Sequence, residues 1–529
     1  MSEVILRTED LTDEDIQRIY VPTDEDKEIL QSLKSKTPVI LCGSRGMGKS
    51  FLFKVSEIQV REENPNIVPV YVTFRSSCML RTSNENQFTV WMLSTLTSKL
   101  LRQLKKKGIY VKDTWQISNV HSDNLIQRLE NTQRSFEESW NKPGEYIDVD
   151  LIPTVDNLID LIEDICEEYS LERIIFYIDE AAHVFIPEEQ IQFFNLFRDL
   201  RSAHIKCNAS VYPGVTYYGD FERRHDCKYL TMTRSITESD YEKKMSEMVL
   251  RQLDDAKKES IKRNYQENFK VLAYASGGNP RVFLKSIEHI NFKLNNDNVN
   301  KVMREFYRTD IWSDHSNMVN KYPQYTEFID WGREFVETVV LPEIKNKNDK
   351  LIDEKGESSI YFWVDRNAPK GVNEALRLLE YSGLIKQQSE GVKGTGSAIG
   401  LRYEVTLGCL LSQEQSPAAA ASKIVEHISL GLFTEFGANN KHFKSIKDTE
   451  AIIDYANTSD SLLTMLDKSI NSLELTNWQK ESLKSIGVNT IKDLLQKTEQ
   501  DLQQIHYVAG YRSRQMRNAA LEAIFEYLY

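Results

Sequence analysis

The sequence predicts an α/β protein whose parallel sheet lies in the N-terminal half and is followed by mainly helical modules. Strand-like and helix-like segments alternate between residues 39 and 212, a glycine-rich stretch joins the first strand to its helix, and an apolar strand at 174–178 ends in two carboxylates. Such alternation is typical of parallel sheets, whose strands are joined through helices. A chain of 529 residues has room for about three or four domains.

The composition is that of a globular protein, with 27% charged and 40% hydrophobic residues. The net charge of −13 argues against a general polyanion binder, so any contact with nucleic acid has to be local. The sequence shows neither a signal-peptide pattern nor an apolar run of membrane-spanning length, so we expect a cytoplasmic protein with no membrane partner. The cysteines are scattered, without zinc-type spacing, which predicts reduced thiols at Cys42, Cys78, Cys166, Cys207, Cys227 and Cys409.

The firmest motif follows the predicted strand 39–42. The stretch GSRGMGKS at 43–50 matches GxxxxGK[ST] between a strand and a helix, which is the pattern of a phosphate-binding loop. Glycines let backbone N–H groups approach an anion, Lys49 would contact the β- and γ-phosphates, and Ser50 would offer its hydroxyl to Mg²⁺. A Gly-rich turn that matches by accident is the alternative. The residues expected to bind ATP are Gly43, Ser44, Arg45, Gly46, Met47, Gly48, Lys49, Ser50 and Phe51.

Further elements flank this loop. Residues 9–36 predict two short lead-in helices, 67–74 a second strand and 88–107 a helix that ends in a lysine run before Gly108. Residues 110–150 are polar, and we expect an irregular insertion or connection outside the core. A further helix is predicted over 155–169.

The run IIFYIDE at 174–180 has the length of a strand buried on both faces and ends in two carboxylates. Asp179 would hold Mg²⁺ beside Ser50, and Glu180 would orient or deprotonate the attacking water. The alternative is a strand that simply ends at an acidic turn. The following residues are similar to the DEAH box of helicases but have one extra residue, and we expect His183 to be a packing or surface residue.

A helix over 188–203 and a strand over 207–212 complete the alternation. In ring-forming ATPases, a neighbour's arginine or a polar residue on the strand after the acidic one completes the site. Tyr212 is a candidate for the second role. Candidates for the first role are Arg198, Arg201, Arg223 and Arg224. The alternative for each of these candidates, and for Tyr212, is a surface or packing role.

Residues 237–294 predict helices broken at SGGNPR, 276–281. Glycines end one helix and Pro280 opens the next, so Arg281 lies in a first turn. A cation there opposes the helix dipole, which suggests a nearby anion. An ordinary helical hairpin with a solvated arginine is the alternative.

Together, GSRGMGKS, IIFYIDE and SGGNPRVFL resemble the AAA+ ATPases of the initiator type, around the origin-recognition proteins, and their STAND signalling relatives, over about residues 15–300. The resemblance implies Mg-ATP hydrolysis with Lys49, Glu180 and Arg281 as catalytic residues and with Ser50 and Asp179 on the metal. In that family Arg281 corresponds to the sensor-2 arginine of a helical lid. The sequence departs from the family at sensor 1, where no Asn or Thr is clearly placed.

The same family implies a winged helix after the lid. Strand-like stretches at 359–364, 384–386 and 401–405, a helical one at 372–381 and a glycine-rich wing at 391–400 agree with it. Such a module binds a groove or a protein, or serves structure alone. Its basic residues are Lys370, Arg377, Lys386, Lys393 and Arg402.

The C-terminal part resembles the helix-hairpin-helix C-terminal domain of the bacterial RNA polymerase α subunit, in LKSIGVNTIKDLL (483–495), Asp501-Leu502 and GYRS (510–513). The resemblance implies that Gly510 lets a phosphate approach and that Arg512 and Ser513 contact it, with Arg514 and Arg517 on the same basic edge. Trp478 and Glu481 stand where that family has an Arg and an Asn for the minor groove. DNA binding and protein docking both stay open.

We therefore predict a P-loop NTPase core over 1–235, a helical lid over 236–300, a winged-helix-like domain over 301–412, a linker over 413–425, and an all-α domain over 426–529 with the helix-hairpin-helix at about 473–529. The first hypothesis is an ATP-driven switch, a homo-oligomer that engages duplex DNA or nucleoprotein in replication, mobile-element control or phage defence, with any effector on a separate protein. The second is a STAND-like signalling ATPase whose C-terminal modules bind proteins and whose nucleotide state controls oligomerisation. A helicase lacks its own motifs here.

Overall fold

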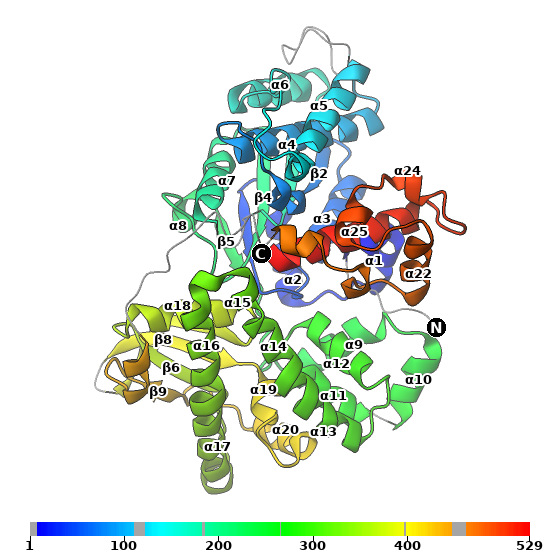
Figure 1. The fold of residues 1–529 in the computed structure, drawn as a ribbon. Helices are drawn as coiled ribbons and strands as arrows, with labels where there is room; N and C mark the ends of the chain where they lie inside the picture. Colours follow the sequence, from blue (N-terminus) through cyan, green and yellow to red (C-terminus); the bar gives the residue numbers. More distant parts are fainter. Residues whose placement is uncertain are drawn as a thin grey trace.

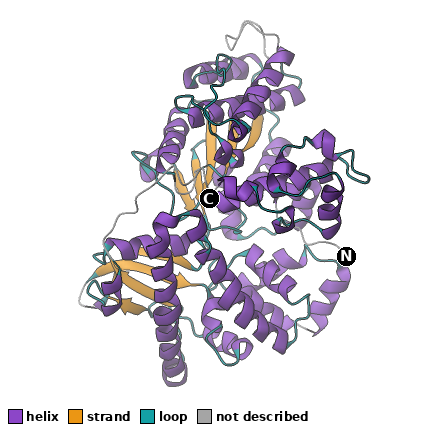
Figure 2. Ribbon diagram, viewed as in Figure 1, coloured by secondary structure: helices purple, strands orange, loops and turns teal. Residues whose placement is uncertain are grey.

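The computed structural model describes residues 8–110, 122–181, 186–264, 266–395, 398–446 and 462–528. Figure 1 shows the core at the top, the helices that follow it at the lower right, a second sheet at the lower left and the C-terminal helices beside the core. The two sheets lie in separate parts of the molecule (Figure 2). Within the described residues, no helix combines the length and apolarity needed to cross a membrane.

A five-stranded sheet forms the core, in the order β2-β3-β4-β1-β5, and all its pairings are parallel. Strands β1, β3 and β4 are buried at every residue. Strand β1 and the centre of β3 are accordingly apolar, whereas β4 also buries Lys206, Asn208 and Ser210. The carboxyl ends of parallel strands share one edge, where ligands bind in sheets of this kind. The predicted α/β fold class is confirmed, with strands β1 (Val39–Cys42), β2 (Ile67–Thr73), β3 (Arg173–Asp179), β4 (Ile205–Val211) and β5 (Lys228–Thr231).

Helices cover both faces of this sheet. The expectation that 110–150 lie outside the core is wrong for the described part, because α5 packs on α4 and fully buries Leu129 and Phe136. Its few apolar residues share one face of an otherwise polar helix, so composition alone hid them. The core helices are α1 (Asp13–Ile19), α2 (Asp24–Lys34), α3 (Lys49–Glu63), α4 (Gln87–Lys106), α5 (Ser122–Glu137), α6 (Val155–Glu168), α7 (Pro187–Asp199) and α8 (Arg223–Asp226).

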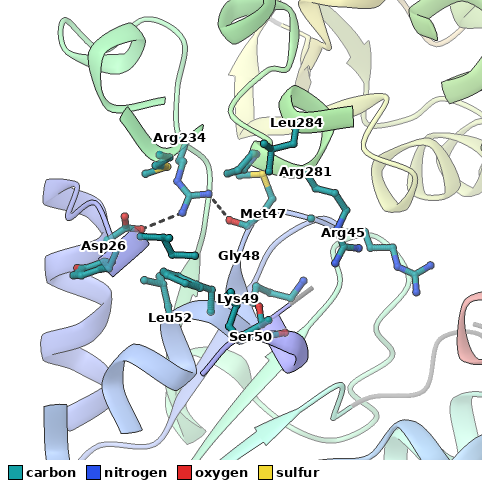
Figure 3. Close-up of a pocket in the computed structure, with 18 of the residues that line it drawn as sticks. Asp26, Arg45, Met47, Gly48, Lys49, Ser50, Leu52, Arg234, Arg281 and Leu284 are labelled. Atoms are coloured by element: carbon teal, nitrogen blue, oxygen red, sulfur yellow. Dashed lines mark hydrogen bonds and ion pairs between the residues drawn. The ribbon is translucent and has the colours of Figure 1, made fainter. Parts of the chain in front are cut away.

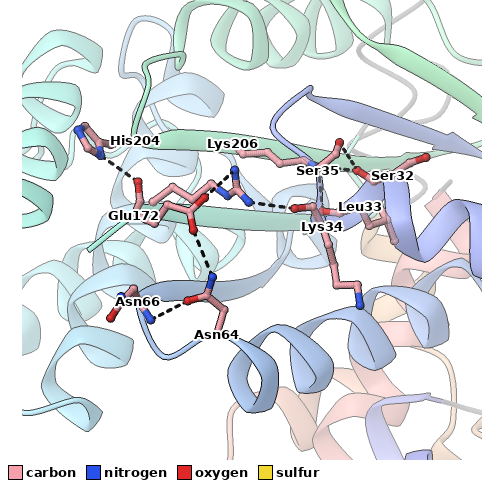
Figure 4. A network of polar contacts seen from close by, with 10 residues as sticks. Ser32, Leu33, Lys34, Ser35, Asn64, Asn66, Glu172, His204 and Lys206 are labelled. Atoms are coloured by element: carbon pink, nitrogen blue, oxygen red, sulfur yellow. Dashed lines mark hydrogen bonds and ion pairs between the residues drawn. The ribbon is translucent and has the colours of Figure 1, made fainter. Parts of the chain in front are cut away.

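Basic side chains from the amino ends of three strands hold the end of α2. Figure 4 shows one of them, Lys206, beside Ser32 and Leu33. Lys206 Nζ donates to the carbonyls of Ser32 and Leu33 at 2.7 and 2.8 Å. Arg173 donates to the Lys34 carbonyl at 3.2 Å, and Lys228 to the Ser32 hydroxyl at 2.8 Å. Cations are favourable beside the last carbonyls of a helix, so this network fixes α2 across the sheet. Burial lowers the pKa of Lys206 to about 7.

The segment that follows the parallel sheet is helical, as predicted for residues 237–294. The break at 276–281 has the expected geometry: Gly277 and Gly278 have φ of 57° and 83°, and the Asn279 side chain accepts from the backbone N–H groups of Arg281 and Val282. Pro280 then starts the next helix. The helices are α9 (Tyr241–Leu250), α10 (Asp255–Asn264), α11 (Gln266–Ala275), α12 (Pro280–His289) and α13 (Asn296–Glu305).

The second sheet has four strands in the order β7-β8-β6-β9. Its elements agree with the strands and the helix expected between 359 and 405, namely β6 (Tyr361–Asp365), α18 (Lys370–Tyr381), β7 (Ile385–Lys393) and β8 (Ile399–Val405), with β9 (Thr434–Phe436) at the edge. A helix-turn-helix needs two helices, whereas α18 alone lies between β6 and β7 in this part of the described chain. The winged-helix assignment therefore stays a prediction. Before this sheet come α14 (Ile311–Ser316), α15 (Met318–Lys321), α16 (Thr326–Phe335) and α17 (Leu341–Lys355).

The linker predicted over 413–425 is largely helical instead. Helix α20 (Pro417–Glu426) follows α19 (Leu407–Leu411) and buries Ala421 and Ile424. Alanine is the strongest helix former and proline suits the first helical position, so a run that resembled a linker forms a packed helix.

The C-terminal domain packs against the core. Helix α25 contacts the short helix Arg75–Met79 of the core, and the Tyr511 hydroxyl donates to the Asp10 carbonyl at 2.7 Å. Figure 1 shows this domain beside α1 and α3. Its helices are α22 (Asn477–Ser485), α23 (Ile491–Leu495), α24 (Glu499–Leu502) and α25 (Gly510–Leu528).

Candidate functional site

One pocket lies at the carboxyl edge of the parallel sheet, between the core and the helices that follow it (Figure 3). It contains about 1090 Å³ of space, part of which is open to solvent. The loop after β1, the ends of β3 and β4, and the first turn of α12 all reach it. The predicted site residues that line it are Arg45, Gly46, Met47, Gly48, Lys49, Ser50, Phe51, Asp179, Glu180, Tyr212 and Arg281.

The glycines of the loop are required by geometry. Gly46 and Gly48 have φ of 81° and 98°, in the left-handed region that glycine adopts without strain. A Cβ on Gly46 would also lie 2.6 Å from Asn279 Oδ1. The Asn279 amide donates to the Arg45 carbonyl at 2.7 Å. The turn before α12 therefore contacts the loop directly.

Lys49 is buried and is held by the loop itself. Its Nζ donates to the Gly43 carbonyl at 2.6 Å and the Ser44 carbonyl at 3.3 Å. It also lies 4.1 Å from the centre of the Tyr212 ring. Burial lowers the pKa of Lys49 to about 8, although Asp179 and Glu180 oppose that shift. A phosphate oxygen is a stronger acceptor than a carbonyl, so this cation is placed to bind one.

The Asp179 carboxylate is oriented by both neighbouring strands. Its Oδ1 accepts from the Ser210 hydroxyl of β4, and its Oδ2 accepts from the Tyr71 hydroxyl of β2, each at 2.6 Å. Asp179 is only 1% exposed. The carboxylate of Asp179 and the hydroxyl of Ser50 are oxygen ligands of the kind that Mg²⁺ prefers, so the donor set fits a magnesium ion bound together with phosphates.

Glu180 has an unusual backbone. Its φ is 55°, and its N–H donates to the Ser210 hydroxyl at 3.0 Å. Its Oε1 accepts from the Tyr212 hydroxyl at 3.2 Å. Residues other than glycine seldom take positive φ, and such residues cluster at functional sites. Tyr212 thus links Lys49, which lies over its ring, with Glu180, which its hydroxyl contacts.

The remaining candidates lie elsewhere. Arg198 pairs with Asp199 at 3.2 Å, and Arg201 with Asp226 at 3.9 Å. Arg223 lies over the rings of Tyr218 and Tyr229, and Arg224 is exposed on α8. None of these four arginines lines the pocket. His183 lies outside the described residues.

Sequence reasoning missed three side chains. Tyr71 and Ser210 could have been found, because they lie near the carboxyl ends of strands that meet Asp179 in the sheet. Arg234 follows β5 and also lines the pocket, but no motif indicated it.

Comparisons with known proteins agree with the two resemblances. The ORC-CDC6-like family matches residues 5–106, and the C-terminal domain of the bacterial RNA polymerase α subunit matches residues 457–509. A search of curated protein sequences found no significant match.

Several solved structures also match, and they include the following two. AMPPCP-bound DnaA from Aquifex aeolicus is 11% identical, with a TM-score of 0.27, over 63% of this chain and 92% of that one. Pif1 helicase from Candida albicans is 14% identical, with a TM-score of 0.19, over 46% of this chain and 48% of that one. At these TM-scores, neither superposition supports a conclusion about this protein. The family matches and the parallel core support an initiator-type AAA+ protein with a C-terminal helix-hairpin-helix domain.

Proposed function

We propose that this protein binds and hydrolyses Mg-ATP, and that its nucleotide state controls the engagement of duplex DNA or nucleoprotein by the C-terminal modules. The main observation in support is the single pocket that the phosphate-loop residues, Asp179, Glu180 and Arg281 line together. The core and the lid each supply part of its wall, so a nucleotide bound there would contact both.

We assign a residue to each chemical step. The loop N–H groups and Lys49 bind the phosphates, while Ser50 and Asp179 would hold Mg²⁺, which neutralises charge on the transferred phosphoryl group. Glu180 accepts a proton from the attacking water or orients it. In this proposal the Tyr212 hydroxyl orients Glu180 and supplies the polar group at the sensor-1 position, and Arg281 of the lid senses the γ-phosphate.

Contacts of α18 and β7 support a switch. The Tyr381 ring packs edge-on against the Tyr212 ring, with 5.7 Å between centroids. Arg377 donates to the Gly214 carbonyl, and Lys386 donates to the Gly277 carbonyl in the lid turn. A displacement of Tyr212 or of the lid turn on hydrolysis would therefore reach the second sheet. This domain serves as the relay in the proposal, whether or not it binds DNA itself.

The edge for DNA is the start of α25. Arg512 and Arg514 are exposed there, and the Arg512 guanidinium lies 5.2 Å from the centre of the Trp478 ring. Cations beside a helix N-terminus suit a phosphate backbone. We expect binding of a fluorescent duplex that weakens steeply with salt, differs between ATP and ADP, and falls in Arg512→Ala/Arg514→Ala. The proposed binding of DNA would be refuted if no duplex bound at low salt, or if the affinity changed neither with the nucleotide nor with the double substitution.

The alternative is a STAND-like signalling ATPase whose C-terminal modules bind proteins. The exposed aromatic side chains of the C-terminal domain favour it, since Trp478, Tyr507 and Tyr511 are 41%, 74% and 49% exposed and aromatic residues are enriched at protein interfaces. ATP-dependent oligomerisation without DNA binding would support this alternative. The cytoplasmic location, the homo-oligomer, the separate effector and the roles in replication, mobile-element control or phage defence belong to the proposal as well.

A further inference from the structure

Arg234 is a buried cation at the hinge between the core and the lid. It follows β5, precedes α9, lines the pocket and is 7% exposed. The proposed chemistry gives it no role.

The guanidinium of Arg234 contacts the phosphate loop (Figure 3). One Nη donates to the carbonyl of Met47, the residue between the left-handed Gly46 and Gly48. The other Nη pairs with Asp26 at 3.3 Å, and the two side chains are 8% and 2% exposed. Among the described residues Nε has no hydrogen-bond partner, so the two Nη contacts account for how this side chain is held.

Hydrogen bonds also hold the backbone of Arg234. The Glu25 carboxylate accepts from the N–H groups of Thr233 and Arg234 at 2.8 and 3.1 Å. Arg234 has a φ of 41°. On its other side lies the lid, where a Cβ on Gly278 would approach the Arg234 carbonyl to 2.4 Å. Helix α2, the phosphate loop and the lid turn therefore all meet at this one residue.

We propose that Arg234 is a positioning residue that fixes the phosphate loop for nucleotide and makes its conformation depend on the hinge. This inference rests on the proposed function. A loop whose glycines accept many torsions has little rigidity of its own. A buried, charge-assisted bond to the central carbonyl restricts it before the ligand arrives, and preorganisation strengthens binding.

The proposal predicts a pattern of affinities. Because Arg234 holds the backbone of the loop that both nucleotides would bind, its loss should weaken the binding of ATP and of ADP alike. We expect Arg234→Met to weaken both by about tenfold or more and to slow the turnover of bound ATP by much less. Arg234→Lys keeps the charge but lacks the planar fork that reaches Asp26 and the Met47 carbonyl together, so its affinities should fall between those of wild type and Arg234→Met.

Lys206→Met is the matched control. Lys206 is also a buried basic side chain that donates to backbone carbonyls and fixes α2, but its acceptors are Ser32 and Leu33 at the far end of that helix. We expect it to lower the unfolding temperature while nucleotide affinities stay within about twofold of wild type. Calorimetric titrations with Mg-ATP and ADP measure these affinities, at a temperature at which circular dichroism shows that every variant is folded.

Unchanged affinities in folded Arg234→Met, or equal losses in Lys206→Met, would overturn the proposal. If Arg234→Met does not fold, Asp26→Asn removes the charge that orients the guanidinium while keeping its shape. It must then weaken ATP and ADP together, and wild-type affinities in that variant would likewise overturn the proposal. The wild-type titration separates the two claims: a wild type that binds no ATP refutes the proposed function as well, whereas a wild type that binds ATP beside an unaffected Arg234→Met refutes only this inference.

Discussion

Replacing Tyr212 by Phe removes one hydroxyl from the pocket and keeps the ring. The ring lies 4.1 Å from Lys49 Nζ, and the hydroxyl donates to Glu180 at 3.2 Å. A hydrogen bond to a charged group contributes about 1.5–3 kcal/mol, and each 1.4 kcal/mol is a factor of ten in rate. Since 3.2 Å is a long bond, the lower end applies. We expect the turnover of ATP to fall about tenfold while the Kd for ATP stays within about twofold.

Single-turnover hydrolysis with enzyme in excess, together with equilibrium titration, separates the two effects. Tyr218→Phe is the control, because the Tyr218 hydroxyl donates at 3.3 Å to Tyr229 away from the pocket. It should leave both quantities unchanged. Wild-type turnover in Tyr212→Phe would refute the role given to the hydroxyl, and a loss of affinity without a loss of rate would show that Tyr212 acts on binding alone.

Three further predictions concern single residues. Lys49→Ala should abolish ATP binding in a calorimetric titration, and retained affinity would contradict the phosphate role of Lys49. Arg281→Ala should uncouple nucleotide from lid closure, so unchanged ATP affinity, turnover and nucleotide-dependent assembly would contradict its role. Burial lowers the pKa of His315 to about 4, so the unfolded chain takes up this proton first. The free energy of unfolding should then fall by about 2 kcal/mol between pH 7 and pH 5. Denaturant titrations at pH 7 and pH 5 should show this loss of stability in wild type and not in His315→Gln. The same change in the free energy of unfolding in both proteins would contradict the prediction.

The sheet and the two strand-end motifs could be predicted because each depends on local sequence. Strand β3 is apolar at the positions buried on both faces, and the glycines of the loop are needed at their own positions. The sequence did not predict the order of the strands. In the structure β4 lies between β1 and β3, which brings the loop and Asp179 together.

Other features depend on contacts that the sequence does not show. Helix α5 is amphipathic with a wide polar face. Helix α20 begins with a run of alanines, which also occurs in linkers. The arrangement around Arg234 joins residues about 190 to 210 positions apart in the chain, and no short pattern records such contacts. Ser210 is intermediate between the predictable and the unpredictable features. Its position near the carboxyl end of a strand could be predicted, but its contact with Asp179 depends on the strand order.

The central claim is that the pocket hydrolyses ATP through Glu180. The most direct measurement is phosphate release by wild type and Glu180→Gln at saturating Mg-ATP, with the Kd for ATP determined for both. The substitution keeps the shape of the side chain and removes its basicity, so we expect similar Kd values and a rate at least about 100-fold lower in Glu180→Gln. Equal rates of phosphate release in the two proteins would contradict the account.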